Sequence, residues 1–119
     1  MQSDFPKSKA RRFRARRSTG DRVRDALIAL GEAQGQLLSH EEKAWASITF
    51  SGTRHEVTFA FDGPDAIAAG ECFVAALPDH EFTIPGQLVA DAAVSKVDHT
   101  LNPAPRMVVT AALLLLEDV

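Results

Sequence analysis

The sequence predicts one α+β domain in which a helix and two strands are followed by a second helix and two further strands. Apolar residues recur at helical spacing in two segments, and each segment precedes residues that alternate between apolar and polar side chains. The 119 residues suffice for one domain and not for two. We therefore expect residues 19–119 to form a four-stranded, mostly antiparallel sheet with both helices packed on one face.

The first helix should begin near residues 18–21, where Ser, Thr and Asp side chains offer capping oxygens. One apolar face follows, made of Val23, Ala26, Leu27, Leu30 and Ala33. Leu37 and Leu38 are expected to extend this helix, although two glycines weaken its interior. Residues 39–42, Ser-His-Glu-Glu, have the form of a capping box and predict a short helical turn before Trp45.

A β-hairpin is predicted where the apolar period changes to two. Residues 46–50 and 56–61 both alternate, and Gly52-Thr53 between them has the composition of a tight turn. The segment Asp62-Gly63-Pro64 ends the second strand, and its proline suits the first position of the next helix.

The second helix is expected to run from Pro64 to a stop at Pro78-Asp79, and its small residues 68–70 would let it lie close to the sheet. Cys72 lies in the middle of this helix, where we expect it to be a buried small apolar residue. A third strand is predicted from Glu81 onward, with a bend or bulge at Pro85-Gly86.

The last strand is predicted at residues 107–116, after a proline-containing turn at 101–105. It is apolar on both faces, which is typical of a central strand. Its leucines at 113–116 must then divide between the helical layer and the open face of the sheet. A homodimer that buries the open face is therefore expected.

The charge of the chain is strongly asymmetric. Residues 1–24 hold nine basic and two acidic side chains, whereas residues 25–119 hold four basic and fourteen acidic ones, and the net charge is −3. Residues 1–18 contain too few large apolar side chains to offset the entropy of ordering. We therefore predict a disordered basic tail ahead of a negatively charged body.

The tail is the main functional candidate because it concentrates arginine. Its candidate residues for binding a polyanion are Arg11, Arg12, Arg14, Arg16 and Arg17. Guanidinium groups bind phosphate and carboxylate through paired donors, and a cationic arm neutralises phosphates without reading their sequence. The expected partner is a nucleic acid or an acidic protein. The alternative is a solvated tail, or one that folds back on the acidic body.

No motif fixes a reaction. The four histidines, His40, His55, His80 and His99, show no metal-binding spacing, and the lone cysteine cannot form an internal disulfide. We predict no catalytic residue, metal ligand or cofactor. The alternative is a small enzyme or ligand-binding domain whose site lies near strand ends, at His55, Asp91 and His99.

These observations predict a non-catalytic interaction module. Its body would self-associate through the last strand, and its arm would recruit a polyanion or an acidic partner. No apolar run is long enough for a membrane span or has the form of a secretory signal. A single cysteine suits a reducing compartment, so we expect a cytoplasmic protein.

Overall fold

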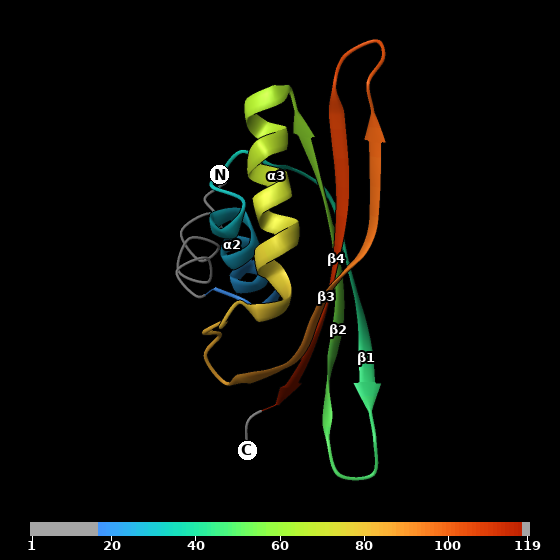
Figure 1. The fold of residues 1–119 in the computed structure, drawn as a ribbon. Helices are drawn as coiled ribbons and strands as arrows, with labels where there is room; N and C mark the ends of the chain where they lie inside the picture. The colour runs from blue at the N-terminus through green and yellow to red at the C-terminus, as the bar shows by residue number, and fades with distance from the viewer. Residues whose placement is uncertain (1–16, 118–119) are drawn as a thin grey trace, which may run out of the picture.

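The computed structural model describes residues 17–117 as two helices and one four-stranded antiparallel sheet (Figure 1). In chain order the elements are α2 (Thr19–Leu30), β1 (Gln36–Ala46), β2 (Ser51–Asp62), α3 (Pro64–Ala76), the 3-10 turn η1 (Leu77–Asp79), β3 (Gln87–Thr100) and β4 (Arg106–Glu117). The strands lie in the order β1-β2-β4-β3, so β4 is central as predicted. The predicted α+β class and element order are confirmed. Most of the predicted tail, residues 1–16, lies outside the described residues.

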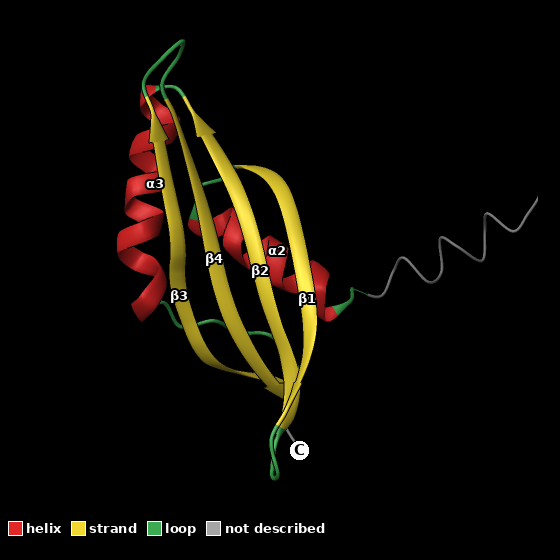
Figure 2. Cartoon of the chain, turned by 90° about the vertical axis from the view of Figure 1, so that its right-hand side faces the viewer, coloured by secondary structure: helices red, strands yellow, loops and turns green. Residues whose placement is uncertain are grey.

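Both helices lie on the same side of the sheet in Figures 1 and 2. Both helices contact the sheet at the same aromatic ring. Gly31, which caps α2, and Gly70, within α3, both face the ring of Phe61 on β2. A Cβ at Gly70 would lie 2.8 Å from this ring and 2.5 Å from the methyl carbon of Met107 on β4. Glycine therefore lets α3 approach the sheet closely.

The core fills the space between the sheet and the helices. Phe73 of α3 is fully buried, and its ring centroid lies 6.0 Å from that of Phe59 and 6.1 Å from that of Phe61. Strand β4 adds alternate buried residues, of which Leu113 and Leu115 are fully enclosed. Burying each such side chain contributes about 1.5–3 kcal/mol to stability.

Helix α2 begins where its capping residues predict. Ser18 is the N-cap, its hydroxyl oxygen accepts from the backbone N–H of Asp21 at 3.0 Å, and the Asp21 carboxylate accepts from the Ser18 N–H at 3.2 Å. These bonds hold the pKa of Asp21 below its ordinary value, the backbone N–H of Ser18 having the largest effect. The reciprocal pair satisfies two donors that a helix start leaves unpaired.

The predicted helical extension and helical turn after residue 36 are wrong. Residues 36–46 form β1, which pairs with β2 along its length. These ladder hydrogen bonds outweigh a capping signal that involves only four residues. The hairpin turn spans residues 47–50, so Ile48 and Phe50 are exposed. Gly52, predicted to lie in the turn, lies within β2, where a Cβ would overlap the carbonyl oxygen of Leu115.

Two further expectations are corrected. The third strand begins at Gln87 and not at Glu81, after a turn in which Gly86 has a φ of +77°. Its irregularities fall between Val89 and Asp91 and between Val94 and Lys96. Cys72 is exposed. The buried face of α3 carries Gly70 and Phe73, and Cys72 lies outside that face, so its position in the middle of the helix did not make it buried.

We expect Gly70→Ala to destabilise the fold by about 1–3 kcal/mol, because the new methyl group overpacks against Phe61. Alanine is the better helix former by about 1 kcal/mol, so the packing contact must reverse the intrinsic preference. Ala68→Gly on the exposed face of α3 is the control and should lose about 1 kcal/mol through propensity alone. Urea unfolding measures both, and a stabilised Gly70→Ala variant would contradict this packing.

Candidate functional site

Two histidines and a glutamate meet on the helix-facing side of the sheet. His40 and Glu42 lie on β1 and His55 on β2, with Glu42 directly opposite His55. One ligand atom from each residue lies within 4.8 Å of the other two. Alternate strand residues share a face, so positions 40 and 42 must point to the same side.

A chain of hydrogen bonds runs from α2 through the two imidazole rings. Arg24 of α2 donates through Nη1 to His40 Nδ1 at 2.8 Å, since a guanidinium has no acceptor. The ring proton of neutral His40 therefore resides on Nε2, which donates to His55 Nδ1 at 2.9 Å. His55 then carries its proton on Nε2. Asp21 holds the other end of the chain, because its carboxylate accepts from Arg24.

The last atom of this chain of hydrogen bonds, His55 Nε2, has no hydrogen-bond partner among the described residues. The residue is 0% exposed, and this nitrogen is the buried side-chain polar atom without a hydrogen bond among the described residues. A buried N–H without an acceptor costs about 1–3 kcal/mol. The alternative ligand site placed His55 near a strand end. Its side chain lies instead within β2, in the same buried row as Val57 and Phe59.

Burial keeps both imidazoles neutral. Loss of hydration lowers the pKa of His40 and of His55 below the ordinary value, and in both this effect exceeds the opposing attraction of Glu42. Arg24 lowers the pKa of His40 further. At neutral pH each ring nitrogen that lacks a proton can therefore act as an acceptor or a metal ligand.

The first turn of α2 covers the cluster. A Cβ at Gly20 would lie 2.7 Å from Glu42 Oε2 and 3.5 Å from His40 Cε1, so a side chain at position 20 would displace this carboxylate. Glu42 thus lies near the positive end of the helix dipole. The His40 side chain is 5% exposed and that of Glu42 50%, so the cluster meets solvent at its carboxylate.

Neutral imidazole nitrogens and a carboxylate form the donor set preferred by zinc and by other first-row divalent metals. Sequence reasoning missed this set. The only signal was the period of two between His40 and Glu42, which becomes visible once residues 36–46 are recognised as a strand. Nothing in the sequence indicates that residue 55 lies opposite residue 42, because strand pairing sets that contact.

The structure does not bring together the other residues proposed for a ligand site. Asp91 is exposed on β3 and pairs in register with Leu114, so it faces the side of the sheet away from His55. His99 is exposed near the far end of β3, opposite Met107. Of the five arginines of the arm, Arg17 alone lies in the described part of the chain, where it pairs with Asp25.

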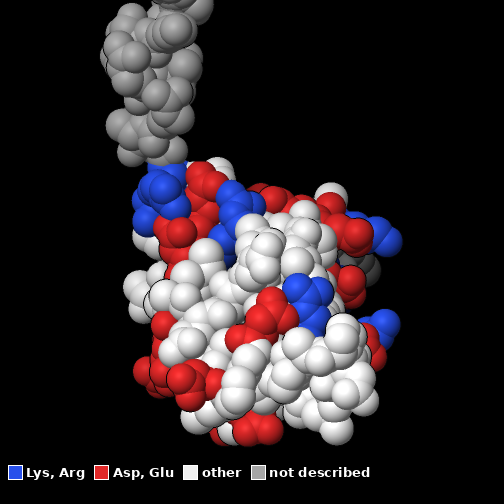
Figure 3. Space-filling view, turned by 90° about the horizontal axis from the view of Figure 1, so that it is seen from above, with Lys and Arg blue, Asp and Glu red and all other residues white. Residues whose placement is uncertain are grey.

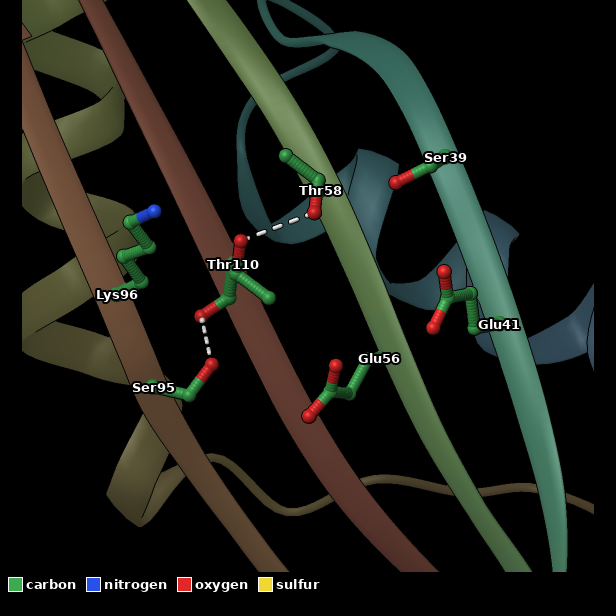
Figure 4. Close-up of a pocket in the computed structure, with 7 residues that line it drawn as sticks. All are labelled: Ser39, Glu41, Glu56, Thr58, Ser95, Lys96 and Thr110. Carbon is green, nitrogen blue, oxygen red and sulfur yellow. Dashed lines mark hydrogen bonds between the residues drawn. The ribbon is translucent and has the colours of Figure 1, made fainter.

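The side of the sheet away from the helices carries a second candidate surface, which we call the open face. Figure 4 shows side chains from all four strands around a shallow hollow of about 280 Å³. Its floor is polar: Thr58 and Thr110 share a hydrogen bond of 2.9 Å, and the Ser95 hydroxyl donates to the Thr110 carbonyl oxygen at 3.3 Å.

Strand register orders the open face into rows. Four rows, each written from β1 through β2 and β4 to β3, are Ser39-Thr58-Thr110-Lys96, Glu41-Glu56-Ala112-Ala93, Lys43-Arg54-Leu114-Asp91 and Trp45-Gly52-Leu116-Leu88. Like charges thus lie opposite each other on β1 and β2, which is unfavourable within one sheet. The charged side chains of these two rows on β1 and β2 are Glu41, Glu56, Lys43 and Arg54. None of them forms an ion pair within residues 17–117.

The surface around α2 mixes both charges. In Figure 3, blue and red side chains lie side by side at the corner where the described chain begins, while white surface predominates farther away. Arg17 pairs with Asp25, and Arg24 pairs with Asp21. Exposed pairs of this kind contribute little to stability, but they occupy basic groups next to the arm.

Comparison with known protein families, curated proteins and solved structures found no match. The helices described here have 12 and 13 residues, and neither is long and apolar enough to cross a membrane.

We expect the protein to lose stability as the pH falls through about 6.5, the ordinary pKa of histidine. Burial lowers both folded-state pKa values, so below 6.5 the unfolded chain binds more protons and acidification favours unfolding. Above this window both states hold neutral rings, and the two groups add no pH dependence. Urea unfolding with a chelator present, at about pH 7.5 and about pH 5.5, measures the loss.

His55→Leu should reduce this pH dependence, because it removes a titrating ring and keeps the buried position apolar. His99→Gln, which alters an exposed histidine, should leave it unchanged. An equal loss of stability in wild type and His55→Leu would show that other groups cause it.

Proposed function

We propose that this protein is a non-catalytic interaction module that pairs with a second copy of itself through the open face. The observation that supports this most directly is the arrangement of charge on that face. Glu41 and Glu56 lie opposite each other, as do Lys43 and Arg54 in the next row, and none of the four forms an ion pair within residues 17–117. A second copy would offer these unpaired side chains further counter-charges.

A two-fold axis along the strands, between two facing sheets, makes the charges complementary. Such an axis sets β1 and β2 of one copy over β3 and β4 of the other in the same row. Lys43 of one copy then faces Asp91 of the other, and Arg54 faces Leu114, one strand away from that aspartate. The two glutamates lie one row from Lys96 of the second copy. Complementary charge of this kind fixes register and partner choice.

The apolar rows at one end of the face support the same partner. Leu88 is exposed and Leu114 half-buried at this end, whereas Leu116 is already buried and offers little further surface. At about 4.8 Å between strands and about 3.3 Å per residue, four strands of this length present roughly 700 Å². A stable interface needs about 800 Å² per partner, so the open face is close to sufficient.

The basic arm supplies the second half of the proposal. Arg11, Arg12, Arg14 and Arg16 precede the first described residue, and Arg17 is the one already paired. We propose that these four guanidinium groups bind the phosphates of a nucleic acid without reading its sequence. Pairing of two copies would bring two arms to one polyanion and raise its effective affinity.

Ala112→Arg should separate the pair into monomers, because Ala112 lies at the centre of the open face and the axis would bring both new charges together. Sedimentation velocity under reducing conditions measures this. Ala68→Arg, which adds the same charge to the exposed face of α3, is the control and should remain dimeric. A monomeric wild type at high micromolar concentration would remove the proposal.

Replacing Arg11, Arg12, Arg14 and Arg16 by glutamine should weaken binding to a single-stranded oligonucleotide. Fluorescence anisotropy in about 50 to 200 mM salt should show a steep salt dependence for the wild type and a shallow one for the variant. Arg22→Gln, an exposed arginine of α2, is the control and should bind nearly as wild type does. If the wild type does not bind, or binds with an affinity that does not change with salt concentration, the phosphate contacts are ruled out.

A further inference from the structure

We propose that His40, Glu42 and His55 bind one divalent transition-metal ion, with zinc as the best-fitting metal. The ligand atoms would be His40 Nε2, His55 Nδ1 and one carboxylate oxygen of Glu42. This site lies on the helix-facing side of the sheet and is independent of the pairing proposed for the open face. The spacing of the histidines in the sequence had indicated no metal site.

The distances suit a tetrahedral metal after small side-chain movements. Ligands of a tetrahedral zinc at about 2.0–2.1 Å from the metal are about 3.3 Å apart. His40 Nε2 lies 2.9 Å from His55 Nδ1 and 3.9 Å from Glu42 Oε2. The two rings must therefore separate slightly and the carboxylate must move inward. Glu42 is half exposed, so this movement needs no change in the backbone.

The surrounding charge favours a dication. Glu42 and Asp21 each carry one negative charge, and Arg24 carries one positive charge. The cluster thus has a net charge of −1 before metal binds. The exposed side of Glu42 leaves space for a water molecule as the fourth ligand.

Metal binding requires a change of tautomer in His40. Its Nε2 gives up the proton that it donates to His55, and Nδ1 takes up a proton, so the ring stays neutral. Nδ1–H can no longer accept from Arg24, and this guanidinium must move away. Asp21, which already holds Arg24, is the nearby carboxylate that can accept from Nδ1. A carboxylate in this role orients a metal-bound histidine.

The burial of His55 is the second observation that indicates a ligand. Its neighbours in the same face of β2 and β4, Val57 and Leu113, are fully buried apolar residues. Leucine at position 55 would complete this core and remove an unpaired buried N–H. The metal would bind Nδ1 and leave this Nε2–H unchanged, so the supporting observation is that an imidazole occupies a core position where leucine would leave no polar group unpaired.

Calorimetric titration of metal-free protein with Zn²⁺, in a Cys72→Ser background that removes the exposed thiol, tests this. One ion per chain is expected. Co²⁺ should give the intense visible absorption of four-coordinate cobalt. His40→Gln and Glu42→Gln should each weaken binding at least about tenfold. The double variant His80→Gln, His99→Gln, which alters exposed histidines, should bind as wild type.

Loss of a folded circular-dichroism spectrum in His40→Gln would leave Glu42→Gln, changed at a half-exposed side chain, as the deciding variant. The absence of saturable binding by wild type, or equal binding by a folded ligand variant, would overturn the metal site.

Arg24→Gln tests the tautomer change. It removes a positive charge and a donor that competes for His40 Nδ1, so it should tighten Zn²⁺ binding several-fold. Arg22→Gln removes the same charge from the exposed face of α2 and should have little effect. Weaker binding by Arg24→Gln would show that the arginine supports the metal, and would overturn the proposed exchange of partners.

Discussion

The packing of both helices on one row of β2 is the contact on which the rest of the structure depends. Phe61 meets glycines of α2 and α3, and Phe59 meets Phe73 of α3. Because the row alternates strictly, its next helix-facing members are Val57 and His55. The same register that builds the core therefore carries a histidine under the first turn of α2. The polar cluster is a continuation of the core and has no separate scaffold.

Two short helices can cover one side of four long strands, and the other side remains open. The open face is not a uniform apolar patch. Threonines lie at its centre and charged residues lie on β1, while β4 carries half-buried aliphatic residues. A mixed surface of this kind resists nonspecific aggregation and favours a partner whose charges match. Such a pattern favours pairing with a second copy through charge as well as through apolar contact.

Much of the fold was predictable, because its signals are local. Ser18 and Pro64 mark the helix starts, and the doubly apolar residues 107–116 mark the central strand. Strand β1 was not predictable from local patterns, since its capping-box residues are polar and its identity comes from pairing with β2. The polar cluster was missed for the same reason. His40 and His55 are 15 residues apart, and only the hairpin register makes them neighbours.

The position of Arg24 connects the core, the cluster and the helix start. Asp21 both closes the capping box of α2 and accepts from Arg24, which in turn donates to His40. The hydrogen bonds that begin the helix therefore set the tautomer of a ring on the sheet. Because a guanidinium can only donate, the proton of His40 lies on the nitrogen that faces His55. The unpaired N–H is therefore that of His55, which is 0% exposed. A metal ion would end this chain by taking the lone pairs of both rings.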